Sequence, residues 1–275
     1  MEVLLTGGRG FVGRNLFGAL RSAGLSVKLF EGDLRDRERV LSLAQSDKID
    51  CIIHLAGLVS GKNTSDFRSV NVEGTKNIAD LSRRLGAKLI FLSSLKVIFS
   101  FDDPYVRSKR EAERILAETV GLRYIILRPS MIYGPGDKKN IGQLIRLAKI
   151  FRALPAFNFR LQLIFIDDLV KAIVASLSLE PNRVVDLGGQ IIGFGDFLKL
   201  LQAGGLNFSI VRWPGFFAAL VRFFSVLPLS PFPAWQVRSL MADEVADDRI
   251  WAGLLKIEQT PLEAGVKRIL RENQN

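Results

Sequence analysis

A glycine-rich turn near the start of the chain constrains its fold more than any other sequence feature. The turn carries Gly7, Gly10 and Gly13. The strand-like run Val3–Thr6 precedes it, and a helical pattern of apolar residues begins at Phe11. Glycines at this spacing let backbone amides approach a phosphate group closely, and the helix N-terminus adds favourable charge for an anion. A strand before the turn and a helix after it together predict a dinucleotide-binding turn.

The first two thirds of the chain continue this alternation of short apolar runs and helical patterns. The further strand-like runs are Ser26–Phe30, Cys51–Leu55, Leu89–Ser93 and Tyr124–Leu127, followed by Leu163–Ile166, Val184–Leu187 and Ser209–Val211. Strands that are apolar throughout and separated by helices indicate a parallel sheet covered on both faces. We therefore predict the α/β class, with a Rossmann-like, doubly wound parallel sheet and a smaller, mostly helical C-terminal substrate lobe.

After about Asn140 the regular alternation of strands and helices gives way to short strands among helices and Gly- or Pro-rich turns, and this change sets the expected domain boundaries. Residues 1–160 are predicted to form the dinucleotide-binding domain, with a strand and helix returning at about 161–189. Residues 190–275 are predicted to form the smaller substrate-binding lobe, which is discontinuous and includes 129–160.

Composition narrows the functional classes. With 48% hydrophobic residues in 275, the chain is too apolar for a disordered protein. The net charge is +10, but the basic residues are scattered, so we predict no nucleic-acid partner. A single cysteine, Cys51, excludes a disulfide framework and a cysteine-built metal site, and we predict no metal. The chain starts directly with a strand-like run, and the apolar stretch from Trp213 is interrupted by Arg222; we expect a cytoplasmic protein.

Two side chains near the turn give opposite indications about the cofactor. Glu31 ends the second strand at the distance expected for an acceptor of ribose hydroxyl groups, which favours NAD. Arg9 lies inside the turn, where a cation would pair with a 2′-phosphate, which favours NADP. Asp33 and Leu34 are expected to flank the adenine. We predict NADP or NAD, with the balance toward NADP.

A second group of residues predicts the chemistry. Tyr105 and Lys109 are one helical turn apart at the start of a helix that runs to Glu118, so both side chains lie on one face. A lysine ammonium there is expected to lower the tyrosine pKa and to hold a nicotinamide ribose. Ser93 and Ser94 end the preceding strand, where a hydroxyl binds the oxygen of a carbonyl or carbinol.

Taken in order, these motifs resemble the extended short-chain dehydrogenases/reductases that act on nucleotide sugars, the NAD-dependent epimerase/dehydratase family. The resemblance covers about Met1 to Gly189 and comprises the turn at 6–13, Gly32-Asp33-Leu34, His54-Leu55-Ala56-Gly57, Asn71-Val72-Glu73-Gly74-Thr75, Ser93-Ser94, Tyr105 with Lys109, Leu127-Arg128-Pro129, Ile132-Tyr133-Gly134-Pro135-Gly136 and Phe165-Ile166-Asp167-Asp168-Leu169.

The resemblance implies a role for each matching residue. Ser94 would orient the substrate, Tyr105 would transfer the proton and Lys109 would bind the ribose. Asn71 would support the active-site backbone, and we interpret His54 as structural. The implied cofactor-binding set is Gly7, Arg9, Gly10, Phe11, Val12, Gly13, Glu31, Asp33, Leu34, Leu55, Ala56, Gly57, Tyr105, Lys109 and Pro129.

Two departures from the family pattern bear on the mechanism. First, only ten residues separate Ser94 from Tyr105, and Ser94-Leu95-Lys96 lacks the acidic pair that dehydratases use to eliminate water, which disfavours dehydration. Second, the second and third strands of the usual pattern are merged between Ser26 and Asp36, which resembles sugar-nucleotide 4-ketoreductases. The chain is similar to a bacterial branch of UDP-hexosamine 4-ketoreductases and epimerases. That similarity implies NAD(P)-dependent reduction of a 4-keto nucleotide sugar, with substrate contacts from Ser94, Lys138, Asn140 and Arg160.

Several alternatives stay open. One is a nucleotide-sugar C4 epimerase. The aromatic region from Trp213 to Trp235 also fits a hydroxysteroid-dehydrogenase-like enzyme with an apolar substrate, a peripheral contact with a membrane, or a homodimer interface. The last is a dinucleotide-binding protein without catalytic activity.

Overall fold

The computed structural model describes residues 1–212, 245–246 and 250–272, apart from residues 47, 62 and 101. The chain divides into two compact units. Unit 1 comprises Met1–Pro129, Leu169–Leu187 and Ile250–Ile257, and unit 2 comprises Ser130–Asp168, Gly188–Arg249 and Glu258–Asn275. The aromatic region from Trp213 to Trp235 lies outside the described residues. The domain boundaries expected from the sequence stay predictions.

Unit 1 is built on a six-stranded sheet in which all neighbours are parallel, in the order β2-β1-β3-β4-β5-β9. The strands are β1 (Glu2–Thr6), β2 (Ser26–Leu29), β3 (Cys51–His54), β4 (Lys88–Leu92), β5 (Arg123–Pro129) and β9 (Arg183–Leu187). The expected strands in this sheet agree with the observed ones to within two residues at each end. Buried runs without polar alternation, such as all four residues of β3, form its centre because helices cover both faces.

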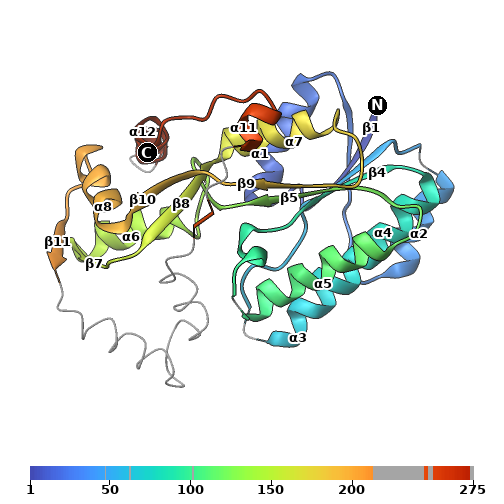
Figure 1. Cartoon of the computed structure of the whole chain (residues 1–275), viewed down its shortest axis with the longest axis horizontal. Helices are drawn as coiled ribbons and strands as arrows, with labels where there is room; N and C mark the ends of the chain where they lie inside the picture. The colour runs from blue at the N-terminus through green and yellow to red at the C-terminus, as the bar shows by residue number, and fades with distance from the viewer. Residues whose placement is uncertain (47, 62, 101, 213–244, 247–249, 273–275) are drawn as a thin grey trace. The chain divides into compact units, whose positions relative to one another are not determined.

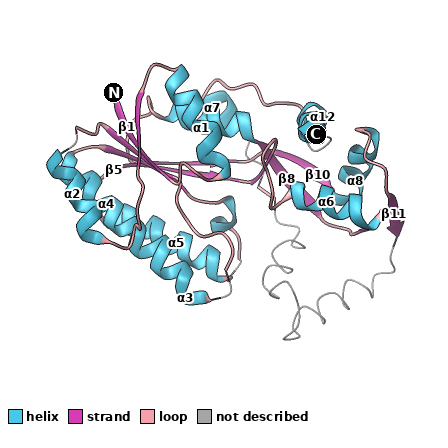
Figure 2. Ribbon diagram, turned by 180° about the vertical axis from the view of Figure 1, so that it is seen from behind, coloured by secondary structure: helices cyan, strands magenta, loops and turns pink. Residues whose placement is uncertain are grey.

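Helices lie on the two faces of this sheet (Figures 1 and 2). One face carries α2 (Arg37–Ser46), α4 (Gly74–Leu85) and α5 (Pro104–Glu118), and the other carries α1 (Phe11–Ser22), α7 (Ile166–Ser176) and α11 (Ile250–Leu254). Short helical segments precede two of them: α3 (Thr64–Phe67) and the π-helix η1 (Arg68–Glu73) before α4, and the 3₁₀-helix η2 (Leu95–Ile98) before α5. The predicted doubly wound, Rossmann-like class is confirmed.

The described part of unit 2 combines two small sheets with helices. The three-stranded sheet has the order β10-β8-β6, and the two-stranded sheet pairs β11 with β7. Its elements are β6 (Met131–Tyr133), α6 (Ile141–Phe151), β7 (Ala153–Ala156), β8 (Arg160–Phe165), β10 (Gln190–Gly193), α8 (Phe194–Ala203), β11 (Ser209–Arg212) and α12 (Leu262–Glu272). The sequence did not reveal β6, β7 and β10, which are three or four residues long.

No helix among the described residues has the length and hydropathy needed to cross a bilayer.

A partly buried ion-pair network joins three elements of unit 1. Arg128 on β5 contacts Glu113 on α5 at 2.6 Å and Asp186 on β9 at 3.2 Å. Burial by itself lowers the pKa of Arg128, but the two carboxylates outweigh that effect and raise it. The Glu113 side chain is only 10% exposed, so its charge is poorly solvated without the arginine.

We predict that Glu113→Gln lowers the free energy of unfolding by about 2 kcal/mol, because Arg128 would lose its more buried partner. Glu118→Gln is the matched control. Its pair with Arg114 has both side chains 60% exposed, and the loss is expected to stay below about 0.5 kcal/mol. Urea unfolding of both variants measures the difference, and equal losses would contradict a special role for the buried pair.

Candidate functional site

The glycine turn has the backbone geometry of a phosphate cradle. Gly7 adopts a left-handed φ of +71°, and a Cβ on it would lie 2.6 Å from the Ala56 nitrogen. A Cβ on Gly13 would lie 2.3 Å from the Gly7 carbonyl oxygen. Helix α1 starts after Gly10 without a side-chain cap and has no acidic residue in its first turn. The amides at this helix start, which include those of Phe11 and Val12, therefore suit an anionic ligand.

Arg9 and Glu31, which gave opposite indications about the cofactor, form an ion pair at 2.5 Å. Both side chains are largely exposed. Asp33 pairs with Arg35, and the hydrogen bonds from that arginine lower the pKa of Asp33 to about 2. Leu34 is buried in the hydrophobic core of unit 1. Glu31, Asp33 and Leu34 thus follow the carboxyl end of β2, and Arg9 reaches Glu31 from the turn after β1.

His54 closes a buried hydrogen-bond relay at the end of β3. Its Nδ1 lies 2.7 Å from the Thr6 hydroxyl and its Nε2 lies 3.0 Å from the Thr75 hydroxyl. Thr75 donates its only proton to the Asn71 carbonyl, so it must accept from His54 Nε2–H. Nδ1 then accepts the proton of Thr6, whose oxygen in turn accepts the Ala56 N–H. Both ring nitrogens are occupied, as the structural interpretation of His54 requires.

The relay continues into the loop after β3, which contains the predicted Leu55, Ala56 and Gly57. Asn71 lies in the π-helical segment η1, and its side chain accepts the Leu58 N–H at 2.6 Å and donates to the Leu58 carbonyl at 2.9 Å. The same amide donates to Ser108, which donates to the Tyr105 carbonyl. One side chain therefore connects the loop after β3 with helix α5. Sequence reasoning missed Ser108, although a hydroxyl between Tyr105 and Lys109 is visible in the motif.

Helix α5 places Tyr105 and Lys109 one turn apart at its start. Asp103 caps the helix by accepting the Val106 N–H at 2.8 Å, and Pro104 occupies its first position. The Tyr105 side chain is hydrogen-bonded to Ser94, which follows β4. Lys109 is 4% exposed and donates from Nζ to the Leu92 carbonyl at 2.8 Å. The three predicted catalytic residues thus gather at the carboxyl ends of the strands.

Burial sets the protonation of this group. It raises the pKa of Tyr105 to about 12; the Asp103 charge adds to this, whereas the bond with Ser94 opposes it. Burial also lowers the pKa of Lys109 to about 8, against the opposing charge of Glu113. The expectation that Lys109 lowers the tyrosine pKa is therefore wrong for this structure, because desolvation dominates. Tyr105 is a protonated phenol at neutral pH, which suits a proton donor.

The remaining predicted residues stand outside this group. Pro129 ends β5 in unit 1, whereas Lys138, Asn140 and Arg160 belong to unit 2. Asn140 precedes α6, and its side chain donates to the Ile132 carbonyl at 3.3 Å. Arg160 begins β8, and Lys138 is exposed. Their role as substrate contacts stays a prediction.

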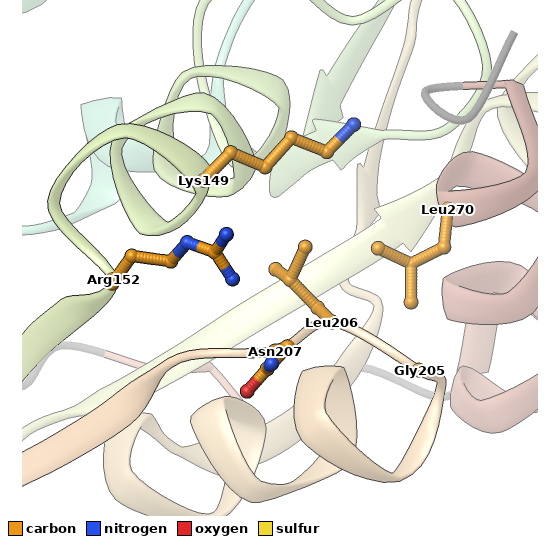
Figure 3. A pocket seen from close by; sticks show the side chains of 6 residues that line it. All are labelled: Lys149, Arg152, Gly205, Leu206, Asn207 and Leu270. Atoms are coloured by element: carbon orange, nitrogen blue, oxygen red, sulfur yellow. The ribbon is translucent and has the colours of Figure 1, made fainter.

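Unit 2 also contains a cavity of about 290 Å³ that the sequence did not indicate (Figure 3). Its lining residues are Lys149, Arg152, Gly205, Leu206, Asn207 and Leu270. Lys149 and Arg152 come from the end of α6, and their positive charges complement the negative end of that helix. None of the predicted substrate contacts lines this cavity.

The chain is similar to known proteins in sequence and in fold. The sequence profile of the NAD dependent epimerase/dehydratase family matches residues 3–188. The chain is 31% identical over 205 residues to the ceramide reductase of Caulobacter vibrioides, covering 67% of this chain and 63% of that protein. It is 26% identical over 237 residues to the UDP-2-acetamido-2,6-beta-L-arabino-hexul-4-ose reductase of Pseudomonas aeruginosa, covering 77% of this chain and 62% of that protein. The chain thus spans less than two thirds of either relative.

A solved structure with the same fold is the UDP-glucose 4-epimerase of Thermotoga maritima with UDP-glucose. It superposes with a TM-score of 0.80 at 20% identity, covering 100% of this chain and 99% of that one. At this identity the likeness supports the fold assignment.

The His54 relay predicts an acid-sensitive fold. Burial lowers the pKa of His54 from 6.5 to about 3, and the charge of Lys109 adds to this effect. Below pH 6.5, His54 is therefore protonated in the unfolded chain and neutral in the folded chain. We expect the free energy of unfolding to fall by about 1.4 kcal/mol per pH unit between pH 6 and pH 5. His54 is the only histidine, and carboxyl groups titrate mostly below this window.

Urea unfolding at several pH values measures this slope. His54→Gln, which has no group titrating in that window, should be less stable than the wild type at pH 7 and should lose the slope. A slope that persists in the variant would contradict the assignment to His54.

Proposed function

Because this chain belongs to the NAD-dependent epimerase/dehydratase family, we propose that it reduces a ketone with a nicotinamide cofactor through Tyr105, Ser94 and Lys109. The predicted family, an enzyme family of extended short-chain dehydrogenases/reductases, is confirmed by the profile match. The observation that carries the proposed chemistry is the placement of Tyr105 beside Ser94 and one helical turn from the buried Lys109. The glycine turn suits the pyrophosphate of the cofactor, because helix α1 starts there without a side-chain cap and without an acidic residue in its first turn.

The proposed step moves one hydride and one proton. A reduced nicotinamide, when bound, would supply the hydride. Ser94 donates a hydrogen bond to the carbonyl oxygen as negative charge develops there. Tyr105 gives its phenolic proton to the same oxygen, and its raised pKa keeps that proton available at neutral pH. Lys109 binds ribose hydroxyl groups and stabilises the phenolate that remains.

For the substrate, we propose the 4-keto group of a nucleotide sugar. The aligned Pseudomonas aeruginosa reductase, named for a UDP-linked hexul-4-ose, supports this choice over 77% of the chain. Lys138 and Arg160 offer cationic groups for a diphosphate, and the net charge of +10 attracts an anionic substrate. Reduction is preferred to C4 epimerisation because Tyr105 is set as a proton donor.

An apolar ketone is the second candidate substrate. The ceramide reductase, named for a lipid, has the higher identity of the two relatives, 31%. Unit 2 also holds three clustered aromatic rings, Phe157, Phe159 and Phe194, with centroid distances between 4.7 and 6.4 Å. Such a cluster suits an apolar chain or ring system.

The first experiment follows oxidation of NADPH and NADH by absorbance with a UDP-4-keto-6-deoxyhexosamine and, separately, with a long-chain 3-ketone. We expect stoichiometric oxidation with the sugar; oxidation with the lipid ketone alone would select the second candidate. Tyr105→Phe should lower turnover at least about 100-fold with little change in cofactor Kd. Tyr124→Phe, on β5, is the control and should retain turnover. Near-normal turnover of Tyr105→Phe would refute the catalytic assignment.

We infer a preference for NADP from Arg9, whose exposed guanidinium in the turn is free to leave Glu31 for a 2′-phosphate. Arg9→Gln should raise the Kd for NADPH about 10-fold and leave that for NADH nearly unchanged. Glu31→Gln should strengthen NADPH binding, since it removes the competing carboxylate. Titration calorimetry of both variants measures the ratio of the Kd for NADPH to the Kd for NADH, and Arg114→Gln is the exposed-arginine control. An unchanged NADPH to NADH ratio in Arg9→Gln would exclude this role.

A further inference from the structure

One buried hydroxyl beside the catalytic group has no partner. Among the residues that the structure describes, Ser93 Oγ is the buried side-chain polar atom without a hydrogen bond. Ser93 is 4% exposed, so bulk water does not solvate it. Its surroundings are otherwise well paired: Lys109, Asn71 and Ser108 all have hydrogen-bond partners. A buried unpaired hydroxyl destabilises a fold, and such groups in native proteins frequently serve a ligand.

The backbone shows which way this hydroxyl faces. The Ser93 N–H donates to the Leu127 carbonyl at 2.7 Å, so pairing with β5 continues one residue beyond the end of β4. Side chains alternate along a strand, which puts Ser93 on the same face as Phe91. Lys109 Nζ lies 4.5 Å from the centre of the Phe91 ring. Ser93 therefore lies on the sheet face that carries Lys109, at the carboxyl end of the strand.

The residues on either side of Ser93, Leu92 and Ser94, both contact residues of the proposed catalytic group. The Leu92 carbonyl holds the Lys109 ammonium, and Ser94 is bonded to Tyr105. Ser94 and Tyr105 are half-buried, so they are more accessible to a substrate than Ser93. In an open parallel α/β sheet, ligands bind outside the carboxyl ends of the strands, where this hydroxyl stands.

We propose that the Ser93 hydroxyl binds the nicotinamide–ribose half of the dinucleotide, through a ribose hydroxyl or the carboxamide, and so fixes that half beneath the substrate. The inference rests on the proposed function. A hydroxyl both donates and accepts, so it matches either group. Ser93 is thus a positioning residue, distinct from Ser94, and its bond forms only when the cofactor is bound.

The test compares Ser93→Ala with Ser82→Ala. Ser82, on α4, is also buried, but its hydroxyl already donates to the Ala87 carbonyl at 2.9 Å. Without ligand, Ser93→Ala should melt at the wild-type temperature or above, since it removes an unpaired group, whereas Ser82→Ala should melt lower. With NADH, Ser93→Ala should raise the Kd at least about 5-fold and Ser82→Ala should not. ADP, which lacks the nicotinamide half, should bind all three proteins equally.

Ser93→Cys, similar in size but a weaker donor, should give an intermediate loss of NADH affinity. The proposal is overturned if Ser93→Ala lowers the melting temperature without ligand and leaves the Kd for NADH unchanged, because the hydroxyl would then have a structural partner. Suppose that the wild-type protein binds NADH and NADPH and that Tyr105→Phe loses turnover. If Ser93→Ala then keeps the wild-type Kd for NADH, the role of Ser93 is refuted and the proposed function stands. If the wild type binds neither dinucleotide, the proposed function fails with it.

Discussion

Polar groups are buried at the carboxyl ends of the parallel strands, and the need to hydrogen-bond them determines how this end of the sheet is built. A covered sheet leaves such groups no water, so each must find a partner in the protein or in a ligand. Thr6, His54, Thr75 and Asn71 form one continuous chain of hydrogen bonds that starts at β1 and reaches the loop after β3. Asn71 extends it through Ser108 to the start of α5. The positions of the glycine turn, the loop after β3 and Tyr105 are therefore coupled.

Sequence reasoning recovered the parts of this arrangement that depend on local spacing. The glycine turn and the Tyr105–Lys109 pair are separated by short, fixed distances along the chain, so strand and helix geometry places them. The strands of the unit 1 sheet were found because apolar runs between helical patterns leave a clear signal. Strand β7 contains Pro155 and only four residues, so neither propensity nor length revealed it.

Interactions between residues far apart in the chain could not be found this way. The ion pair of Arg9 with Glu31 joins two side chains that, taken one at a time, indicated different cofactors. The pKa of Tyr105 depends on how deeply the folded chain buries the phenol, and burial reverses the shift expected from a neighbouring cation. The partners of His54 come from β1 and α4, and no pattern around His54 predicts them.

The two pKa shifts at α5 have one physical cause and opposite chemical consequences. Desolvation disfavours the charged form of either group, so it keeps Tyr105 protonated and weakens the hold of Lys109 on its proton. A phenol that retains its proton is matched to reduction, in which the oxygen of the substrate becomes negative. A negatively charged phenolate formed in that step would raise the lysine pKa again, since an opposite charge nearby favours the ammonium. In the proposed reduction, burial would therefore keep the proton on Tyr105 until it is transferred, and Lys109 would stabilise the phenolate only after that transfer.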